Sequence, residues 1–299
     1  MKQPDWPTGL PMNFGGLEDE FASLEKARAV ILPVPYDFST TYQGGTRWGP
    51  RAILSASQNM ELWDEECGAT YQHGIHTLAE LEPTALGPET MAARVEQAVA
   101  WILDQKKFPL MLGGEHSLTA GAVRAAHARF PKLSVLQIDA HGDMRDTYLE
   151  SKYSHACVMR RVRDRVPAAS VGIRSISEEE REYLDQHPAP IWSTRQFRAL
   201  KGDWKPILDT LTEHVYVTFD VDGLDPSICP GTGTPEPGGL DWYEAVDLLA
   251  AVAKKSQIVG ADVVELAPLP GQVVSDFLCA RLTYRMIGLA LGARVKATV

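Results

Sequence analysis

The feature that most constrains the fold is a series of short apolar runs, several of which show no alternation with polar residues. These runs are rich in Val, Ile, Leu and Phe and lie at 28–34, 108–112, 133–138, 169–173, 215–219 and 258–264. Such runs are typical of strands in parallel sheets, where helices cover both faces. Longer amphipathic segments, which we expect to be helices, lie at 89–105, 118–129, 155–165, 178–186, 204–211, 242–254 and 275–291. The alternation predicts an α/β fold, a three-layer α/β/α sandwich with a mostly parallel central sheet.

Composition and continuity favour one folded domain. Of the 299 residues, 44% are hydrophobic and 23% are charged, which excludes an intrinsically disordered chain. We find no internal repeat or linker, so we expect a single domain over residues 1–299. No apolar stretch approaches the roughly 18 residues that cross a membrane. The N-terminus lacks the pattern of a secretory signal, and the four cysteines form no CxxC pair. We therefore expect a cytoplasmic protein with reduced thiols.

The charge balance bears on the partners. Lys and Arg number 29 and Asp and Glu number 39, which gives a formal net charge of −10. An acidic chain of this kind disfavours sequence-independent binding to nucleic acid or to anionic membranes. It is compatible with a small cationic ligand.

Acidic and imidazole side chains follow four of the apolar runs, at the points where the strands would end. They are Asp139, His141 and Asp143 after the third run, Asp220 and Asp222 after the fifth, His116 after the second and Glu265 after the sixth. Residues two apart in an extended chain point to the same side. If the strands are parallel, their carboxyl ends lie at one edge of the sheet, and we expect these side chains to gather there.

Four gathered aspartates would repel one another, and two divalent cations would balance their charge. We therefore predict a binuclear metal site whose ligands are His116, Asp139, His141, Asp143, Asp220 and Asp222. A single Asp after a strand is often a turn or capping residue, so the prediction depends on the combination. Carboxylate ligands with some imidazole favour Mn²⁺, and paired metals generate a hydroxide nucleophile near neutral pH.

Two further residues are candidates for the chemistry. Ser154 is a predicted helix N-cap, which places His155 in the first turn, where the helix dipole disfavours the imidazolium and allows proton exchange near pH 7. An exposed histidine without a role is an equal alternative. Glu265 closes a buried strand and needs either a structural Arg or a cationic substrate as its partner. Asp225, followed by Pro226, is predicted to be a turn residue.

Three segments together resemble the ureohydrolase family, the arginases and agmatinases. They are GGEHS at 113–117, DAHGD at 139–143 and TFDVDGLDP at 218–226, and the resemblance extends from PVPYD at 33–37 to GADVVELAP at 260–268. It implies a three-layer α/β fold, two Mn²⁺ ions per subunit, hydrolysis of a guanidinium group to urea and an amine, and a homo-oligomer, commonly a trimer or hexamer. Position by position, the six predicted ligands match the family's metal ligands. Glu265 matches the carboxylate that binds the guanidinium, and His155 matches the proton-shuttling histidine. The implied mechanism would also have Asp143 accept a hydrogen bond from the hydroxide.

The substrate is the least constrained part of this resemblance. Arginases carry an Asn where this chain has Arg145, and that Asn helps to read the α-amino acid end of arginine. The segments DMRDTY, YSHACVMRR and GTGTPEPGG resemble agmatinases, so we expect agmatine to be hydrolysed to putrescine and urea, a step of polyamine biosynthesis. Guanidinobutyrate, whose carboxylate would suit Arg145, arginine and formimidoylglutamate remain alternatives. A two-metal phosphoesterase or a non-catalytic homologue is less compatible with the acidic Glu265 and the complete ligand set.

Overall fold

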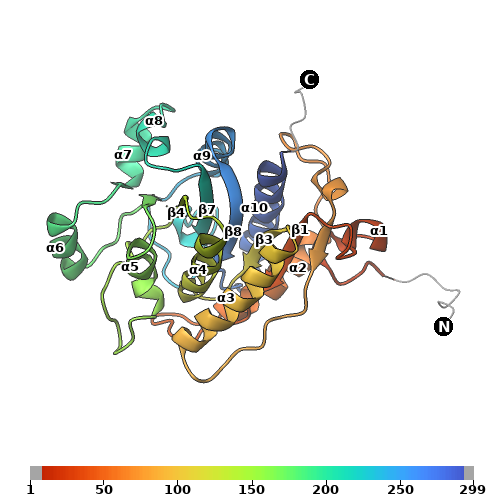
Figure 1. Cartoon of the computed structure of the whole chain (residues 1–299), viewed down its shortest axis with the longest axis horizontal. Coiled ribbons are helices and arrows are strands. Elements are labelled where there is room, and N and C mark those ends of the chain that lie inside the picture. Colours follow the sequence, from red (N-terminus) through yellow and green to blue (C-terminus); the bar gives the residue numbers. More distant parts are fainter. Residues whose placement is uncertain (1–8, 293–299) are drawn as a thin grey trace, which may run out of the picture.

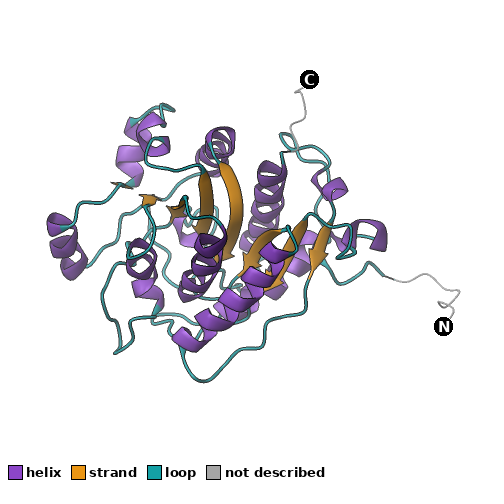
Figure 2. Ribbon diagram, viewed as in Figure 1, coloured by secondary structure: helices purple, strands orange, loops and turns teal. Residues whose placement is uncertain are grey.

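The computed structural model describes residues 9–292, which form an α/β fold around one eight-stranded parallel sheet (Figure 2). The strands are β1 (Ala29–Pro33), β2 (Ile75–Thr77), β3 (Phe108–Leu112), β4 (Leu133–Ile138), β5 (Ala168–Val171), β6 (Ile191–Trp192), β7 (His214–Asp220) and β8 (Gln257–Val264). Their order across the sheet is β2-β1-β3-β8-β7-β4-β5-β6, and every pairing is parallel.

Helices cover both faces of this sheet (Figure 1). They are α1 (Asp19–Ala22), α2 (Gly49–Ser57), α3 (Pro88–Asp104), α4 (Thr119–Arg129), α5 (Val158–Arg163), α6 (Glu178–Gln186), α7 (Thr194–Ala199), α8 (Lys205–Leu208), α9 (Trp242–Lys255) and α10 (Val274–Leu291). Short 3₁₀ helices are η1 (Phe14–Gly16), η2 (Thr46–Trp48), η3 (Thr70–His73), η4 (His116–Leu118), η5 (His155–Cys157) and η6 (Val221–Gly223). No described helix is long and apolar enough to span a membrane.

Two hydrophobic cores explain why the strands are apolar throughout. In β1, Val30 and Leu32 belong to the core that contains α3, α4 and α5, whereas Ala29 and Ile31 belong to the core that contains α2, α9 and α10. Successive strand residues point to opposite faces, so a strand covered on both sides buries every residue. The three-layer architecture expected from the apolar runs is confirmed.

Most of the predicted strands and helices are present, and most of those that were not predicted are short. Strands β2 and β6 were not predicted, because runs of three and two residues carry no periodic signal. Helices α1, α2 and α7 were also missed. α2 begins at Gly49 with a proline in its first turn. The predicted helix over 155–165 consists of η5 followed by α5. The single-domain assignment of residues 1–299 stays a prediction.

Candidate metal centre and active site

The sheet order brings the predicted functional side chains to one place. The strands they follow, β3, β8, β7 and β4, are consecutive neighbours in the centre of the sheet. Because these strands are parallel, the residues after them lie at the same edge. The acidic and imidazole side chains that follow these four strands therefore lie at one edge, as expected. Because the four strands are also neighbours in the sheet, the side chains lie closer together than a shared edge alone would require.

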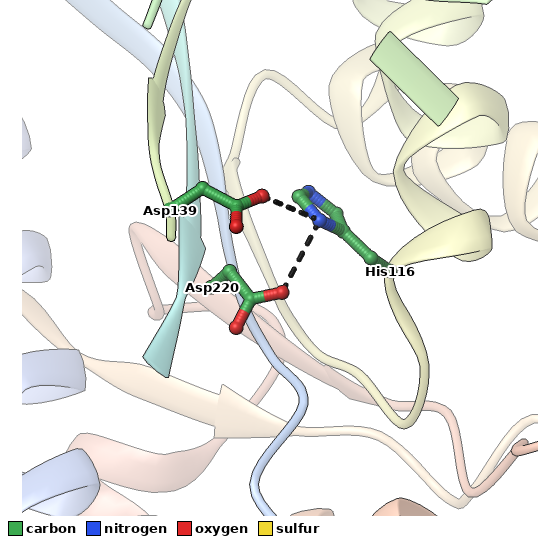
Figure 3. Close-up of side chains that lie close together, drawn as sticks. All are labelled: His116, Asp139 and Asp220. Carbon is green, nitrogen blue, oxygen red and sulfur yellow. Dashed lines mark ion pairs between the residues drawn. The ribbon is translucent and has the colours of Figure 1, made fainter. Parts of the chain in front are cut away.

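The first group of ligand atoms surrounds His116, the first residue of η4 (Figure 3). Its Nδ1 lies 3.2 Å from Asp139 Oδ2 and 3.3 Å from Asp220 Oδ2. Asp143 Oδ2 is 3.0 Å from the same nitrogen. His116 and Asp139 are almost completely buried, at 1% and 0% exposure, so this group is screened from water.

The second group shares a residue with the first. His141 Nδ1 lies 2.9 Å from Asp222 Oδ2 and 3.7 Å from Asp139 Oδ1. One ligand atom from each of Asp139, His141 and Asp222 lies within 4.8 Å of the others, as in the group of His116, Asp139 and Asp220. Two His/Asp triads that share Asp139 are the arrangement expected of a binuclear metal centre.

The protonation of this cluster shows that its carboxylates lack sufficient positive partners. Burial, followed by the charges of Asp143 and Asp222, raises the pKa of Asp139 to about 7. Burial and the same kind of repulsion raise the pKa of Asp220 well above its ordinary value. Burial opposes charge on His141, but Asp222 outweighs it and raises the pKa of His141 to about 11. Protons thus occupy sites where divalent cations would relieve the repulsion.

The hydrogen bonds around His116 are those expected if its ring binds a metal ion. The buried Nδ1 has no hydrogen-bond partner among the described residues, although carboxylates surround it. Nε2 lies 2.8 Å from Thr218 Oγ1, and the Thr218 hydroxyl donates to Asp262 Oδ1 at 2.7 Å. Because that hydroxyl proton is committed to Asp262, Nε2 must carry the ring proton and donate to Thr218. In the neutral ring the lone pair is therefore on Nδ1, which faces the cluster. Burial opposes charge on His116, but the neighbouring aspartates outweigh it and raise the pKa of His116 well above its ordinary value, so a bound metal ion would displace a proton from Nδ1.

Local backbone geometry fixes the carboxylates. Asp139 accepts hydrogen bonds from the backbone N–H of His141 at 2.6 Å and from Gln137 Nε2 at 2.7 Å. Asp143 and Glu265 both have left-handed backbone conformations, with φ of 52° and 64°. This conformation is costly for non-glycine residues, and such strain gathers at functional sites. Here it occurs at two residues predicted to be functional.

Glu265 lies beside the metal cluster and borders an open cavity. Its Oε1 accepts the backbone N–H of His116 at 2.6 Å, and burial followed by repulsion from Glu115 raises its pKa well above the ordinary range. No Arg or Lys pairs with it among the described residues, so no structural Arg supplies its counter-charge there. The cavity encloses about 210 Å³ and is lined by residues 40–43, 141, 143, 145, 148, 155, 156, 175–177, 180, 220, 222, 233, 234 and 265.

Two candidate residues lie at the side of this cavity. His155 borders it and packs its ring edge against Tyr148, with ring centroids 5.9 Å apart. Ser154 occupies the N-cap position of η5, as predicted, but its side chain makes no capping hydrogen bond. The Arg145 guanidinium lies 4.9 Å from the Tyr148 ring centroid and 3.6 Å from Glu179, so its charge is partly compensated. Beyond the pocket, Asp225 accepts backbone N–H groups in a turn.

The sequence reasoning missed residues that support the ligands. Asp262 is a single acidic residue inside the apolar strand β8 and is completely buried, a sequence signal for a functional hydrogen-bond network. Glu115, within GGEHS, was seen but given no role. Ser39, which contacts Glu115, lies in a loop and carries no distinguishing pattern in the sequence.

Comparison with known proteins agrees with this geometry. The model of the arginase family matches residues 27–288. The N(1)-aminopropylagmatine ureohydrolase of Synechocystis is 40% identical over 96% of this chain and 97% of its own length, and the agmatinase of Bacillus cereus is 34% identical over 83% and 86%. The crystal structure of agmatine ureohydrolase of Thermoplasma volcanium superposes with a TM-score of 0.85 at 32% identity and covers 94% of both chains.

Proposed function

Because this chain belongs to the arginase family, we propose that it is a binuclear manganese ureohydrolase that cleaves the guanidinium group of agmatine or of an N-substituted agmatine. The observation that carries this proposal is the placement of Glu265. A buried carboxylate without a basic partner among the described residues borders the cavity beside both His/Asp triads. A cationic, planar guanidinium would supply the missing charge and two parallel N–H donors.

The proposed metal ligands are the six residues of the sequence prediction. Two Mn²⁺ ions held there would provide a hydroxide nucleophile near neutral pH. Glu265 would hold the guanidinium nitrogens and so fix the orientation of the carbon that is attacked. Asp143, besides acting as a ligand, would accept a hydrogen bond from the nucleophile.

His155 is the proposed source of the proton for the leaving amine. The reaction consumes one water and divides the guanidinium into urea and an amine, and the amine needs a proton to leave. A histidine at the side of the cavity, not among the metal ligands, can deliver that proton near pH 7. We assign Glu265 and His155 to substrate binding as well, because both border the space the guanidinium would occupy.

We propose two candidate substrates, which differ in the amine chain attached to the guanidinium. Agmatine, expected from the agmatinase-like segments, gives putrescine. N(1)-aminopropylagmatine is the second candidate, because four relatives that are 34% to 40% identical to this chain are all named for hydrolysis of it. Both amine chains are linear and cationic, which suits the acidic cavity. The carboxylate of guanidinobutyrate would instead need Arg145 to be released from Glu179. Cytoplasmic location and a homo-oligomer, trimer or hexamer, stay predictions.

The test is release of urea by purified protein loaded with Mn²⁺. Agmatine, N(1)-aminopropylagmatine, arginine, guanidinobutyrate and formimidoylglutamate should be compared by kcat/KM under identical conditions, with release of glutamate as the readout for formimidoylglutamate, whose formimidoyl group yields formamide and not urea. We expect the two cationic amines to be preferred over the three substrates that carry a carboxylate. If metal analysis finds two ions per chain and no guanidino compound releases urea, the proposed activity is wrong.

A further inference from the structure

Glu115 immediately precedes the ligand His116, yet its carboxylate serves a different purpose. It is completely buried and belongs to neither His/Asp triad. Within the part of the chain that the structure describes, no Lys or Arg forms an ion pair with it. A buried carboxylate without a cation is costly unless hydrogen bonds compensate it, so the donors around Glu115 indicate its role.

The Glu115 carboxylate accepts three hydrogen bonds, and two of them come from Ser39. The Ser39 backbone N–H donates to Oε2 at 2.5 Å, and the Ser39 hydroxyl donates to Oε1 at 2.7 Å. Ser117 Oγ donates to Oε1 at 2.5 Å. Ser39 is 76 positions from Glu115 and lies in the loop between β1 and η2, so the carboxylate fixes a distant loop against the end of β3.

Ser39 in turn contacts His155. Since the Ser39 hydroxyl proton is committed to Glu115, its oxygen can only accept from other groups. It accepts the backbone N–H of His155 at 3.0 Å, and it lies 3.4 Å from Nδ1 of the His155 ring. Ser154 Oγ is also 3.4 Å from Nδ1. Both neighbouring hydroxyls thus contact Nδ1, and none of the hydrogen bonds made by the described residues involves Nε2.

We propose that Glu115 and Ser39 are positioning residues that hold the His155 imidazole for proton transfer, with Nδ1 donating to Ser39 and Nε2 left free to exchange the proton. The inference rests on the proposed function, because it assigns His155 the role of proton donor. Neither Glu115 nor Ser39 belongs to a His/Asp triad. Ser39 contacts the site through His155, whereas Glu115 also repels Glu265, so substitutions of Ser39 test the positioning role most directly.

The matched pair Ser39→Ala and Ser117→Ala tests this assignment. Both remove a hydroxyl that donates to the same Glu115 oxygen, but only Ser39 contacts His155. We expect Ser39→Ala to lower kcat by roughly 10- to 100-fold with little change in KM, the effect of a misplaced catalytic group. We expect Ser117→Ala to lower kcat far less. Ser39→Thr, which keeps the hydroxyl, should restore most of the rate.

A double-mutant cycle with His155→Asn separates positioning from general structural damage. His155→Asn alone should lower kcat by about 100-fold or more. In that background, Ser39→Ala should cost no more than about twofold further, because the group through which it acts is absent. Metal content should stay at two ions per chain in every variant.

The outcomes are distinguishable. Three results would overturn the positioning role and leave the ureohydrolase proposal standing. They are losses of kcat that multiply when Ser39→Ala is combined with His155→Asn, reduced metal content in Ser39→Ala, and full activity of His155→Asn. Absence of urea release by the wild-type protein with every guanidino substrate would instead overturn the proposed function, and this inference with it.

Discussion

Two buried ionic clusters in this molecule are built on opposite principles. The Arg285 cluster, which joins α10 to residues 64–66, contains its own counter-charges. Arg285 and Asp64 are each 1% exposed, and Nε donates to Asp64 Oδ2 at 2.8 Å. The Glu66 carboxylate lies 3.1 Å from Nη1 of Arg285. Here a buried cation is matched by carboxylates supplied by the chain itself.

The metal centre has no such balance. Four aspartates gather at the sheet edge around two imidazoles, and no Lys or Arg among residues 9–292 lies within 4.0 Å of those carboxylates. Burial and mutual repulsion raise the pKa values of Asp139 and Asp220 as a result. The buried pair of Arg285 and Asp64 is neutral by itself, so removing one partner leaves an uncompensated charge, whereas a buried group of carboxylates without a Lys or Arg attracts an added cation. Substitutions in the two clusters should therefore have different consequences.

Substitution of the shared ligand should have the largest effect. Asp139 contributes to both triads, so Asp139→Ala is expected to remove both metal ions and abolish urea release. Asp222→Ala, which affects one triad, should also abolish activity, with metal loss. Metal analysis by inductively coupled plasma mass spectrometry, beside the urea assay, checks both. Retention of two ions by Asp139→Ala would show that the triads are not the metal centre.

Substitution in the Arg285 cluster should lower the free energy of unfolding and leave the number of bound metal ions unchanged. Asp64→Asn leaves Arg285 without its best-paired carboxylate in a buried position, which typically costs about 3–5 kcal/mol of unfolding free energy. Denaturant unfolding of the metal-loaded protein measures this loss. The folded variant should still bind two ions per chain. A normal midpoint together with metal loss would reverse the roles we assign to the two clusters.

Metal binding should depend on pH with a predictable sign. In chelator-treated protein His141, with a pKa of about 11, carries a proton that must leave at any pH between about 6 and 8. Asp139, with a pKa of about 7, carries a second proton only below that value. Apparent Mn²⁺ affinity should therefore fall as pH falls, by roughly tenfold per pH unit for each displaced proton, and more steeply below about pH 7.

Calorimetric titration with Mn²⁺ in two buffers of different ionisation enthalpy counts the released protons directly. Because other members of the cluster exchange protons too, the informative quantity is the increase in that count between about pH 8 and pH 6. An affinity that is flat over this range would mean that the carboxylates are already balanced without metal, as they are in the Arg285 cluster.

The gathering of the candidate ligands could be predicted from the sequence because these residues are local to strand ends. Asp139 and Asp222 follow long apolar runs, and the period of a strand fixes the side on which they lie. The sequence could not supply the order of the strands, which depends on how the helices pack, nor the contact between Ser39 and Glu115, which joins residues 76 positions apart. Strands as short as β6, with two residues, are formed by neighbouring pairing and leave no pattern of their own.

The smallest expected effect concerns the support of one ligand. Thr218 accepts a hydrogen bond from His116 Nε2 and donates its own proton to Asp262, which fixes the ring with Nδ1 facing the carboxylates. Thr218→Val should weaken Mn²⁺ binding by about 10- to 100-fold, the usual cost of losing such a partner. Competition with a chelator of known affinity measures this change. Thr119→Val is the matched control, because Thr119 also donates to Asp262 but makes no hydrogen bond to His116. Equal losses in the two variants would assign the effect to the surroundings of Asp262. A loss confined to Thr218→Val would show that the hydrogen bond between His116 and Thr218 keeps Nδ1 oriented toward the carboxylates, where it can bind a cation.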